Sequence, residues 1–235
     1  EEGPLGGSVT HILESPSGQI IVRVVDINTV MRLSLFNGLE WDEPDFLGDN
    51  DSRVSDMPQF VVVGGGKLWI STIWDGLVAF DGQKWQLYDA DVRTDWLVKT
   101  PDGRLWTKSW DLDGISSFDG QKWRLEFNTD NSLLDGTTTN TVLATSNGMI
   151  LLGTDEGLFQ YDTVLNAITD LKLGEVEVSH LYQTADQSLW VATNKGLHQL
   201  TNGKWQLTLA GQVINTIQQT DKGQLWVGTS NGLYH

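Results

Sequence analysis

One short phrase recurs along the whole chain, and this repetition constrains the fold more than any other feature. The phrase is clearest from Asp221 to His235, which reads DKGQLWVGTSNGLYH. Degraded copies are centred on six anchor positions: Ile21, Trp69, Trp106, Leu151, Trp190 and Trp226. The first and last anchors are 205 residues apart over five intervals, a mean of 41. That spacing is typical of four-stranded propeller blades and is longer than the helical and leucine-rich repeats of about 20 to 34 residues.

Two further landmarks follow the anchors. Six to eight residues after most of them comes a Gly-Leu or Gly-Ile pair, and most copies then have an Asn-Gly or Asp-Gly turn before a tryptophan, as in Asp81-Gly82 before Trp85. Such turns between short apolar runs indicate hairpins, because both turn residues accept positive φ. β-branched and aromatic residues crowd the runs, and no window keeps the spacing of an amphipathic helix. The sequence therefore predicts an all-β, six-bladed β-propeller of four-stranded antiparallel blades.

The length of 235 residues fits one propeller domain, and the sequence contains no low-complexity linker. We expect a single domain over residues 1–235, with blades at about 8–46, 56–90, 94–127, 138–172, 176–208 and 213–235. The last of these blades has no fourth strand, so we expect it to be incomplete. Glu1 to Leu5 should pair at most weakly beside the strand that ends at His235, because Pro4 cannot donate to a ladder.

The phrase from Asn215 to Tyr234, NTIQQTDKGQLWVGTSNGLY, resembles the two-component regulator propeller repeat. That repeat has an apolar strand, an Asp-x-x-Gly turn, Leu-Trp-x-Gly-Thr and Gly-Leu. The first copy departs from it, since Ile21 replaces the tryptophan and Arg32 the glycine. The resemblance implies an extracytoplasmic propeller, periplasmic or secreted, that senses a ligand or binds a partner and is often fused to a histidine kinase. The chain itself contains no kinase or receiver sequence.

Composition narrows the classes of partner. The formal net charge is −16, from 15 Lys and Arg against 31 Asp and Glu. Binding to nucleic acid or to anionic lipid needs clustered basic residues. We therefore expect no nucleic-acid partner and no membrane insertion, and a small molecule, a glycan or another protein as the partner. The absence of cysteine excludes disulfides and Cys-ligated zinc.

Three tryptophans outside the anchor pattern define the first candidate site. They fall in or near loops that should open around the channel of a propeller, and binding residues concentrate in such loops. With the neighbouring aspartates, the candidate ligand-binding residues are Trp74, Asp75, Trp96, Trp110, Asp111 and Asp113. Aromatic faces there could stack on a sugar or cup a cationic or aromatic ligand. The alternative is that the rings plug the channel mouth or fill a blade interface.

A second candidate set is a ring of first-strand positions. Counted back from each turn, these positions are Thr10, Pro58, Trp96, Asn140, His180 and Asn215. Four of the six can form hydrogen bonds through their side chains, so such a ring could hold ordered water or a small ligand. They are Thr10, Asn140, His180 and Asn215. The alternative is a water-filled channel without a ligand.

Acidic residues gather between Trp41 and Asp56, in WDEPDFLGDNDSRVSD. Oxygen ligands at this density suit calcium, but the segment lacks the glycine and the glutamate spacing of a calcium-binding loop. We therefore predict a solvated acidic loop, with no bound metal and no other cofactor.

The sequence contains no catalytic motif: no cysteine nucleophile, GxSxG elbow, HExxH or phosphate loop. We predict no catalytic residues and a non-enzymatic binding or sensing module that recognises its ligand or partner through the loop face around the channel. Two alternatives stay open because a propeller does not fix function. One is a protein-interaction scaffold in a larger assembly, and the other is a carbohydrate-active lyase or hydrolase.

Overall fold

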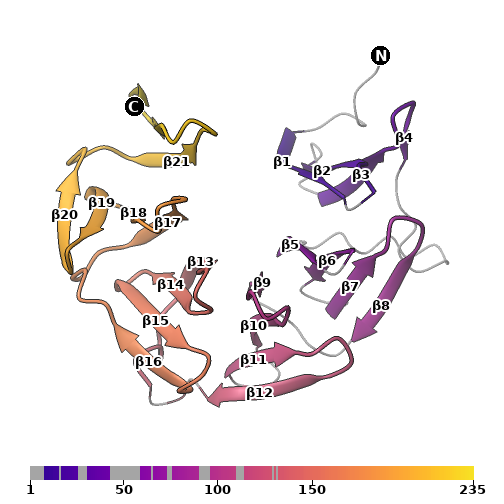
Figure 1. The fold of residues 1–235 in the computed structure, drawn as a ribbon, viewed down its shortest axis with the longest axis horizontal. Helices are drawn as coiled ribbons and strands as arrows, with labels where there is room; N and C mark the ends of the chain where they lie inside the picture. Colours follow the sequence, from indigo (N-terminus) through magenta and orange to yellow (C-terminus); the bar gives the residue numbers. More distant parts are fainter. Residues whose placement is uncertain are drawn as a thin grey trace. The chain divides into compact units, whose positions relative to one another are not determined.

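The structure, a computed structural model, describes residues 8–15, 17–25, 31–42, 59–64, 66–72, 76–89, 96–109, 114–128, 130 and 132–235. All regular secondary structure in these segments is β-strand. None of the described residues forms a helix long and apolar enough to cross a membrane. The strands form six antiparallel sheets, each built from consecutive strands (Figure 1). The predicted all-β fold of antiparallel sheets is therefore confirmed.

The chain divides into two compact units. The first comprises Glu1–Lys99 and Gly103–Leu125, and the second comprises Thr100–Asp102 and Glu126–His235. The first three sheets contain β1 (Ser8–Glu14), β2 (Ile20–Val25), β3 (Met31–Phe36), β4 (Trp41–Asp42), β5 (Gln59–Gly64), β6 (Lys67–Thr72), β7 (Gly76–Phe80), β8 (Trp85–Asp89), β9 (Val98–Lys99), β10 (Leu105–Ser109), β11 (Gly114–Phe118) and β12 (Trp123–Asn128).

The remaining three sheets contain β13 (Thr139–Ala144), β14 (Ile150–Thr154), β15 (Leu158–Asp162), β16 (Ala167–Asp170), β17 (Val178–Gln183), β18 (Leu189–Thr193), β19 (Gly196–Thr201), β20 (Lys204–Thr208), β21 (Ile214–Gln219), β22 (Leu225–Thr229) and β23 (Gly232–Tyr234). Five sheets have four strands, and the last has the three strands β21–β23. Every sheet falls inside the residue range expected for one blade, except that β12 extends one residue beyond its range, to Asn128.

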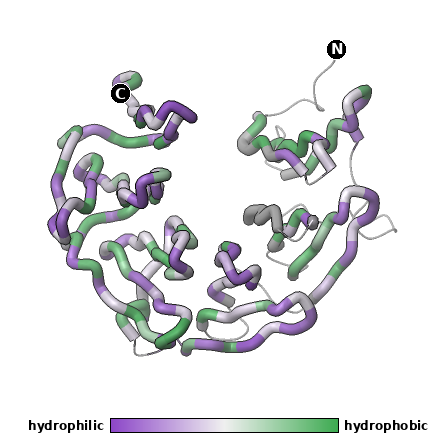
Figure 2. Tube along the Cα trace, viewed as in Figure 1, coloured by the Kyte–Doolittle hydropathy of each residue, from purple (hydrophilic) through white to green (hydrophobic). Residues whose placement is uncertain are grey.

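Buried apolar side chains join neighbouring sheets inside each unit. In the first unit, Ile21 and Leu33 share a cluster with Leu68 and Phe80 of the next sheet. In the second unit, one cluster links sheets β13–β16 and β17–β20 through Leu151, Leu158, Val178, Leu181 and Val191. Figure 2 shows hydrophobic stretches along the strands and hydrophilic residues at many of the hairpin turns. Packing between sheets is thus the source of the core, because each sheet buries its apolar faces against its neighbours.

The anchor positions of the repeat lie in the second strands and contribute to these clusters. Trp106 is 1% exposed, Leu151 is 3% exposed and Trp69 is 8% exposed. Trp190 is half-buried and packs against the cluster shared by sheets β17–β20 and β21–β23. Trp226, in the three-stranded sheet, is half-buried and stacks on His235 with the ring centroids 5.0 Å apart. The anchors are therefore packing residues: Ile21, Trp69, Trp106 and Leu151 are buried, and Trp190 and Trp226 are half-buried.

The hairpins between third and fourth strands form differently from the predicted mechanism. At Asn37, Asp81 and Asp119, the Oδ1 atom accepts the backbone N–H groups two and three residues later, at 2.9–3.1 Å. Positive φ is then needed only at the following glycine. Of the four turns, Asn202-Gly203 alone has positive φ at both residues.

Candidate functional site

The structure tests the predicted aromatic set at one residue. The other five members lie outside the described residues: Trp74, Asp75, Trp110, Asp111 and Asp113. Trp96 is 7% exposed. Its indole Nε1 is buried and has no hydrogen-bond partner within the described part of the chain. This burial favours the packing alternative for Trp96, because so little of the ring is open to a ligand.

A β-bulge near the start of the first strand positions the second candidate set. In five sheets the register between first and second strands shifts there. In four of them the shift leaves a single bulged residue: Thr10, Asn140, Ser179 or Asn215. Bulges re-aim side chains and are frequent beside functional sites. Asn140 and Asn215 are therefore equivalent, as predicted. The equivalent residue in β17 is Ser179, and the prediction of His180 was wrong. The prediction counted back from the aspartate of each turn. Asp186 lies two residues after Thr184, whereas Asp221 lies one residue after Thr220, so the count was displaced by one residue.

The three bulged residues of the second unit are exposed polar side chains: Asn140, Ser179 and Asn215. The Nδ2 of Asn140 donates to the carbonyl of Val178 in the next sheet, at 3.3 Å. The Oγ of Ser179 donates to the carbonyl of Ala192 at 3.4 Å. Because β13 contacts β17 and β17 contacts β21 (Figure 1), these side chains follow one another along adjacent first strands.

His180 follows the bulge in β17 and is half-buried. Burial lowers the pKa of its imidazole below the usual value of 6.5, so the ring is neutral at pH 7. A neutral imidazole offers one donor and one acceptor. The described residues contain no group of three or more His, Asp or Glu side chains that could hold a metal ion. Of the acidic segment considered for calcium, Trp41 and Asp42 alone are described.

The hairpins between second and third strands of the second unit share one hydrogen-bonded frame. A buried threonine ends each second strand, and its Oγ1 donates to the carbonyl three residues later and accepts the N–H two residues later, at 3.0–3.1 Å. The three threonines are Thr154, Thr193 and Thr229. This frame explains the threonine of the Leu-Trp-x-Gly-Thr phrase, because it satisfies the polar groups of a tight turn.

Each hairpin tip is also tied to the segment that leads into its own first strand. In each case a backbone N–H of the tip donates to a backbone carbonyl of that segment, at 3.0–3.1 Å. The pairs are Asp155 with Thr138, Asn194 with Glu177, and Ser230 with Val213. The tips therefore lie beside the bulged residues. We call the three tips and the three bulged residues the loop face: Asp155, Glu156, Asn194, Lys195, Ser230, Asn231, Asn140, Ser179 and Asn215.

The side chains of the loop face differ from sheet to sheet although the frame is constant. The exposed tip residues are two acids in the first hairpin, an amide and a lysine in the second, and a hydroxyl and an amide in the third. In order, they are Asp155 and Glu156, Asn194 and Lys195, and Ser230 and Asn231. Asn231 donates to Gln212 at 2.9 Å, and the Nζ of Lys195 donates to the carbonyl of Glu175 at 3.2 Å. Such a surface can exchange hydrogen bonds with a polar ligand while its backbone stays fixed.

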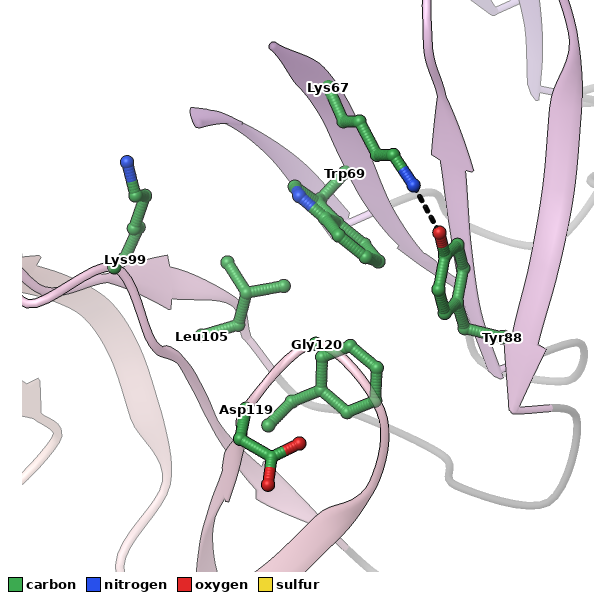
Figure 3. A pocket seen from close by; sticks show the side chains of 9 residues that line it. Lys67, Trp69, Tyr88, Lys99, Leu105, Asp119 and Gly120 are labelled. Carbon is green, nitrogen blue, oxygen red and sulfur yellow. Dashed lines mark hydrogen bonds between the residues drawn. The ribbon is translucent and has the colours of Figure 1, made fainter. Parts of the chain in front are cut away.

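A pocket of about 340 Å³ lies between sheets β5–β8 and β9–β12 of the first unit (Figure 3). Its lining includes Lys67, Trp69, Tyr88, Lys99, Phe118 and Asp119. No motif in the sequence points to this pocket, because its residues come from separate strands and turns. The available signal was Lys99, which stands where Gln183 and Gln219 stand in other copies of the repeat.

Comparison with family models finds the two component regulator propeller at residues 208–231. Among solved structures, the chain is similar to the extracellular domain of the hybrid two component system BT4673 from B. thetaiotaomicron, at 21% identity and a TM-score of 0.73. That match covers 99% of this chain and 32% of the other. The extracellular domain of BT3049, from the same organism, matches at 19% identity and a TM-score of 0.71, covering 97% and 33%.

Virginiamycin B lyase from Staphylococcus aureus has a similar fold, at 16% identity and a TM-score of 0.67, with 95% of this chain and 82% of the lyase covered. No curated protein matches the chain. The chain spans about a third of the length of the two B. thetaiotaomicron structures, whose extracellular location agrees with the location expected here. The resemblance seen in the sequence is thus confirmed at residues 208–231, which match the two component regulator propeller, and the chain has the fold of these extracellular domains.

Proposed function

We propose that the chain is a non-enzymatic binding or sensing module, built as a six-bladed propeller, that recognises a polar ligand through the loop face. The observation that carries this proposal is the constant threonine frame with unlike tips. A frame at Thr154, Thr193 and Thr229 holds each backbone in the same conformation, while the exposed side chains change. Exposed side chains on loops that a rigid scaffold holds in place are where binding residues concentrate.

The fold of the matched domains supports a role outside the cytoplasm. BT4673 and BT3049 are described as two component systems, and the matched parts are their extracellular domains. We propose that this chain likewise senses or binds its ligand on the outer side of a membrane. The likeness to the lyase is one of fold, and reaction chemistry must be argued from a site. The amides and hydroxyls of the loop face suit binding by hydrogen bonds.

The scaffold alternative predicts a broad apolar surface. The most exposed apolar pair of the second unit is Val164 at 86% and Leu165 at 75%, at the tip of the hairpin between β15 and β16. That tip lies at the opposite ends of the strands from the loop face. Two adjacent side chains are ordinary for a protein surface and smaller than the apolar patches that mark interfaces. The polar loop face is therefore the better-supported recognition surface.

A ligand screen followed by point variants tests the proposal. Neutral and cationic glycans and small molecules would be screened by thermal shift, and each hit titrated by calorimetry. We expect Asn215→Ala and Asn140→Ala to weaken a hit about tenfold each, because each substitution removes hydrogen bonds from a ligand. Gln206→Ala, an exposed amide on β20, is the matched control and should leave affinity unchanged. Hits that bind both loop-face variants as tightly as the wild type would refute the proposal.

A further inference from the structure

Glutamine latches join neighbouring sheets in the second unit, at the hairpins between first and second strands. Gln183 ends β17, and its Oε1 accepts the N–H of Ser146 in the preceding sheet at 3.2 Å. Gln219 ends β21, and its Oε1 accepts the N–H of Ala185 at 2.9 Å. Each latch depends on the carbonyl oxygen of the glutamine side chain, which can accept a backbone N–H.

Lys99 holds the corresponding position in the first unit. It precedes the anchor Trp106 by seven residues, as Gln183 precedes Trp190 and Gln219 precedes Trp226. An ammonium group has donors and no acceptor, so it cannot close the same latch. Lys99 instead borders the pocket of about 340 Å³. Within the described part of the chain, its Nζ has neither a hydrogen bond nor an ion pair.

Lys67, at the start of β6, supplies a second cation to the same pocket. Its Nζ donates to the hydroxyl of Tyr88 (Figure 3) and lies 4.9 Å from the Tyr88 ring centroid and 5.8 Å from that of Trp69. These contacts hold the ammonium over two aromatic faces. An ammonium has three donors, so two stay available, and the Tyr88 hydroxyl can still donate its own proton.

The lining between the two lysines includes apolar side chains, two of them aromatic. Trp69 is 8% exposed, Leu105 is 3% exposed and Phe118 is 1% exposed. The rings of Trp69 and Phe118 meet edge to face, with centroids 5.6 Å apart. Among the described residues of the lining, Asp119 is the one acid. The N–H groups of Lys122 and Gln121 donate to its Oδ1 and lower the pKa of this carboxyl, so it is charged at neutral pH.

We propose that this pocket binds a small organic anion in which a carboxylate is carried on a six-membered ring. The ammonium of Lys67 and the hydroxyl of Tyr88 beside it match the carboxylate, because charge-assisted hydrogen bonds are stronger than neutral ones. Lys99 adds a second positive charge at the opposite border of the pocket (Figure 3). The walls around Trp69 match the face of the ring. The volume lies at the small end of ligand pockets and suits one ring. The chain as a whole repels anions, because its net charge is −16. The two lysines make the electrostatic potential in the pocket more favourable for an anion.

This site is separate from the loop face. The pocket is bordered by the hairpin turns at Gly103 and Gly120, which join first to second and third to fourth strands. The loop face is formed by hairpins that join second to third strands in the three sheets of the second unit, so the two sites share no residue. Binding in the pocket therefore stands or falls independently of the proposed function.

Four ligands distinguish the kinds of ring. Glucuronate carries the carboxylate on a hydroxylated ring, whose hydroxyls could donate to Asp119, and benzoate carries it on an aromatic ring. Glucose and benzyl alcohol are their uncharged counterparts. Titrations would follow tryptophan fluorescence, since Trp69 lines the pocket. We expect one or both anions to bind saturably and about tenfold or more tightly than the uncharged counterpart. Failure of both anions, or equal binding of the uncharged ligands, would overturn the proposal.

Substitution of the cation locates the binding. Lys99→Gln introduces the residue found at the latch positions of the second unit, so the fold should be kept, which the melting temperature checks. We expect this variant to bind the anion about tenfold more weakly. Lys222→Gln removes the same charge from an exposed turn of the second unit and should bind as the wild type does. Undiminished binding by folded Lys99→Gln would place the anion elsewhere and refute the assignment.

Discussion

Gly153 shows why the repeat has glycine before its threonine. A Cβ at this position would lie 2.5 Å from the Cγ1 of Val178 and 2.6 Å from the Cγ2 of Thr141. Val178 belongs to β17 in the next sheet, so the glycine permits the close approach of β17 to the second strand β14. We expect Gly153→Ala to lower the free energy of unfolding by about 1–3 kcal/mol, because it overpacks this contact. Urea denaturation measures the loss.

Gly228→Ala is the matched control for that substitution. Its Cβ would meet the Cγ2 of Thr216 at 2.9 Å, and its next nearest neighbour lies at 3.9 Å. The side chain of Thr216 belongs to the same sheet and can shift, so the cost should be smaller. Equal losses in the two variants would show that close packing between sheets is not the reason for the glycine.

Two histidines, the half-buried His180 and the buried His198, make stability depend on pH. Burial lowers the pKa of both His180 and His198 below 6.5. Below about pH 6.5 the unfolded chain therefore binds more protons than the folded chain, and stability is lost as the pH falls towards the folded pKa values. We expect the melting temperature to fall between about pH 7.5 and about pH 5.5. The double variant His180→Gln, His198→Gln should show a shallower fall.

Calorimetry at several pH values provides this comparison. The carboxyls of Asp81, Asp119, Asp170 and Asp186 also have lowered pKa values. Their contribution is present above the unfolded value of 3.8 and is lost as the pH falls below it, which separates it from the histidine window. The same slope in the wild type and the double variant would exclude the histidines as the cause.

Among the elements, the hairpin between β18 and β19 depends on one buried hydroxyl. The Oγ1 of Thr193 donates to Gly196 at 3.0 Å and accepts from Lys195 at 3.1 Å. Thr193→Val keeps the shape of the side chain but removes its hydroxyl, so the Gly196 carbonyl and the Lys195 N–H each lose a hydrogen bond. We expect a loss of about 1–3 kcal/mol in the free energy of unfolding. Thr208→Val, which removes an exposed hydroxyl bonded to Leu197, should cost less than half as much.

The strands themselves were the most predictable elements. Anchor spacing and Gly-Leu pairs fixed the second and third strands, because both are buried and leave a strong apolar pattern. The register of the first strand was predicted correctly at Asn140 and Asn215 and wrongly at His180. A bulge adds one residue without changing composition, so counting from a turn that varies in sequence cannot place it.

The whole molecule contains features that no local phrase encodes. The all-β fold and the repeat family followed from the sequence, since a period near 41 residues admits few architectures. The pocket at Lys67 and Lys99 did not, because it depends on side chains brought together from two sheets. The aromatic site at Trp74 and Trp110 lies outside the described residues and stays a prediction.

Hydrogen–deuterium exchange with and without a ligand found in the loop-face screen tests the central claim, which is recognition through the loop face, most directly. We predict slower exchange at residues 154–157, 193–196 and 229–232 when the ligand is bound, because it would restrain the hairpin tips. The hairpin at residues 163–166, at the opposite ends of the strands, should exchange unchanged. Protection at 163–166 with none at the three hairpin tips would contradict the account.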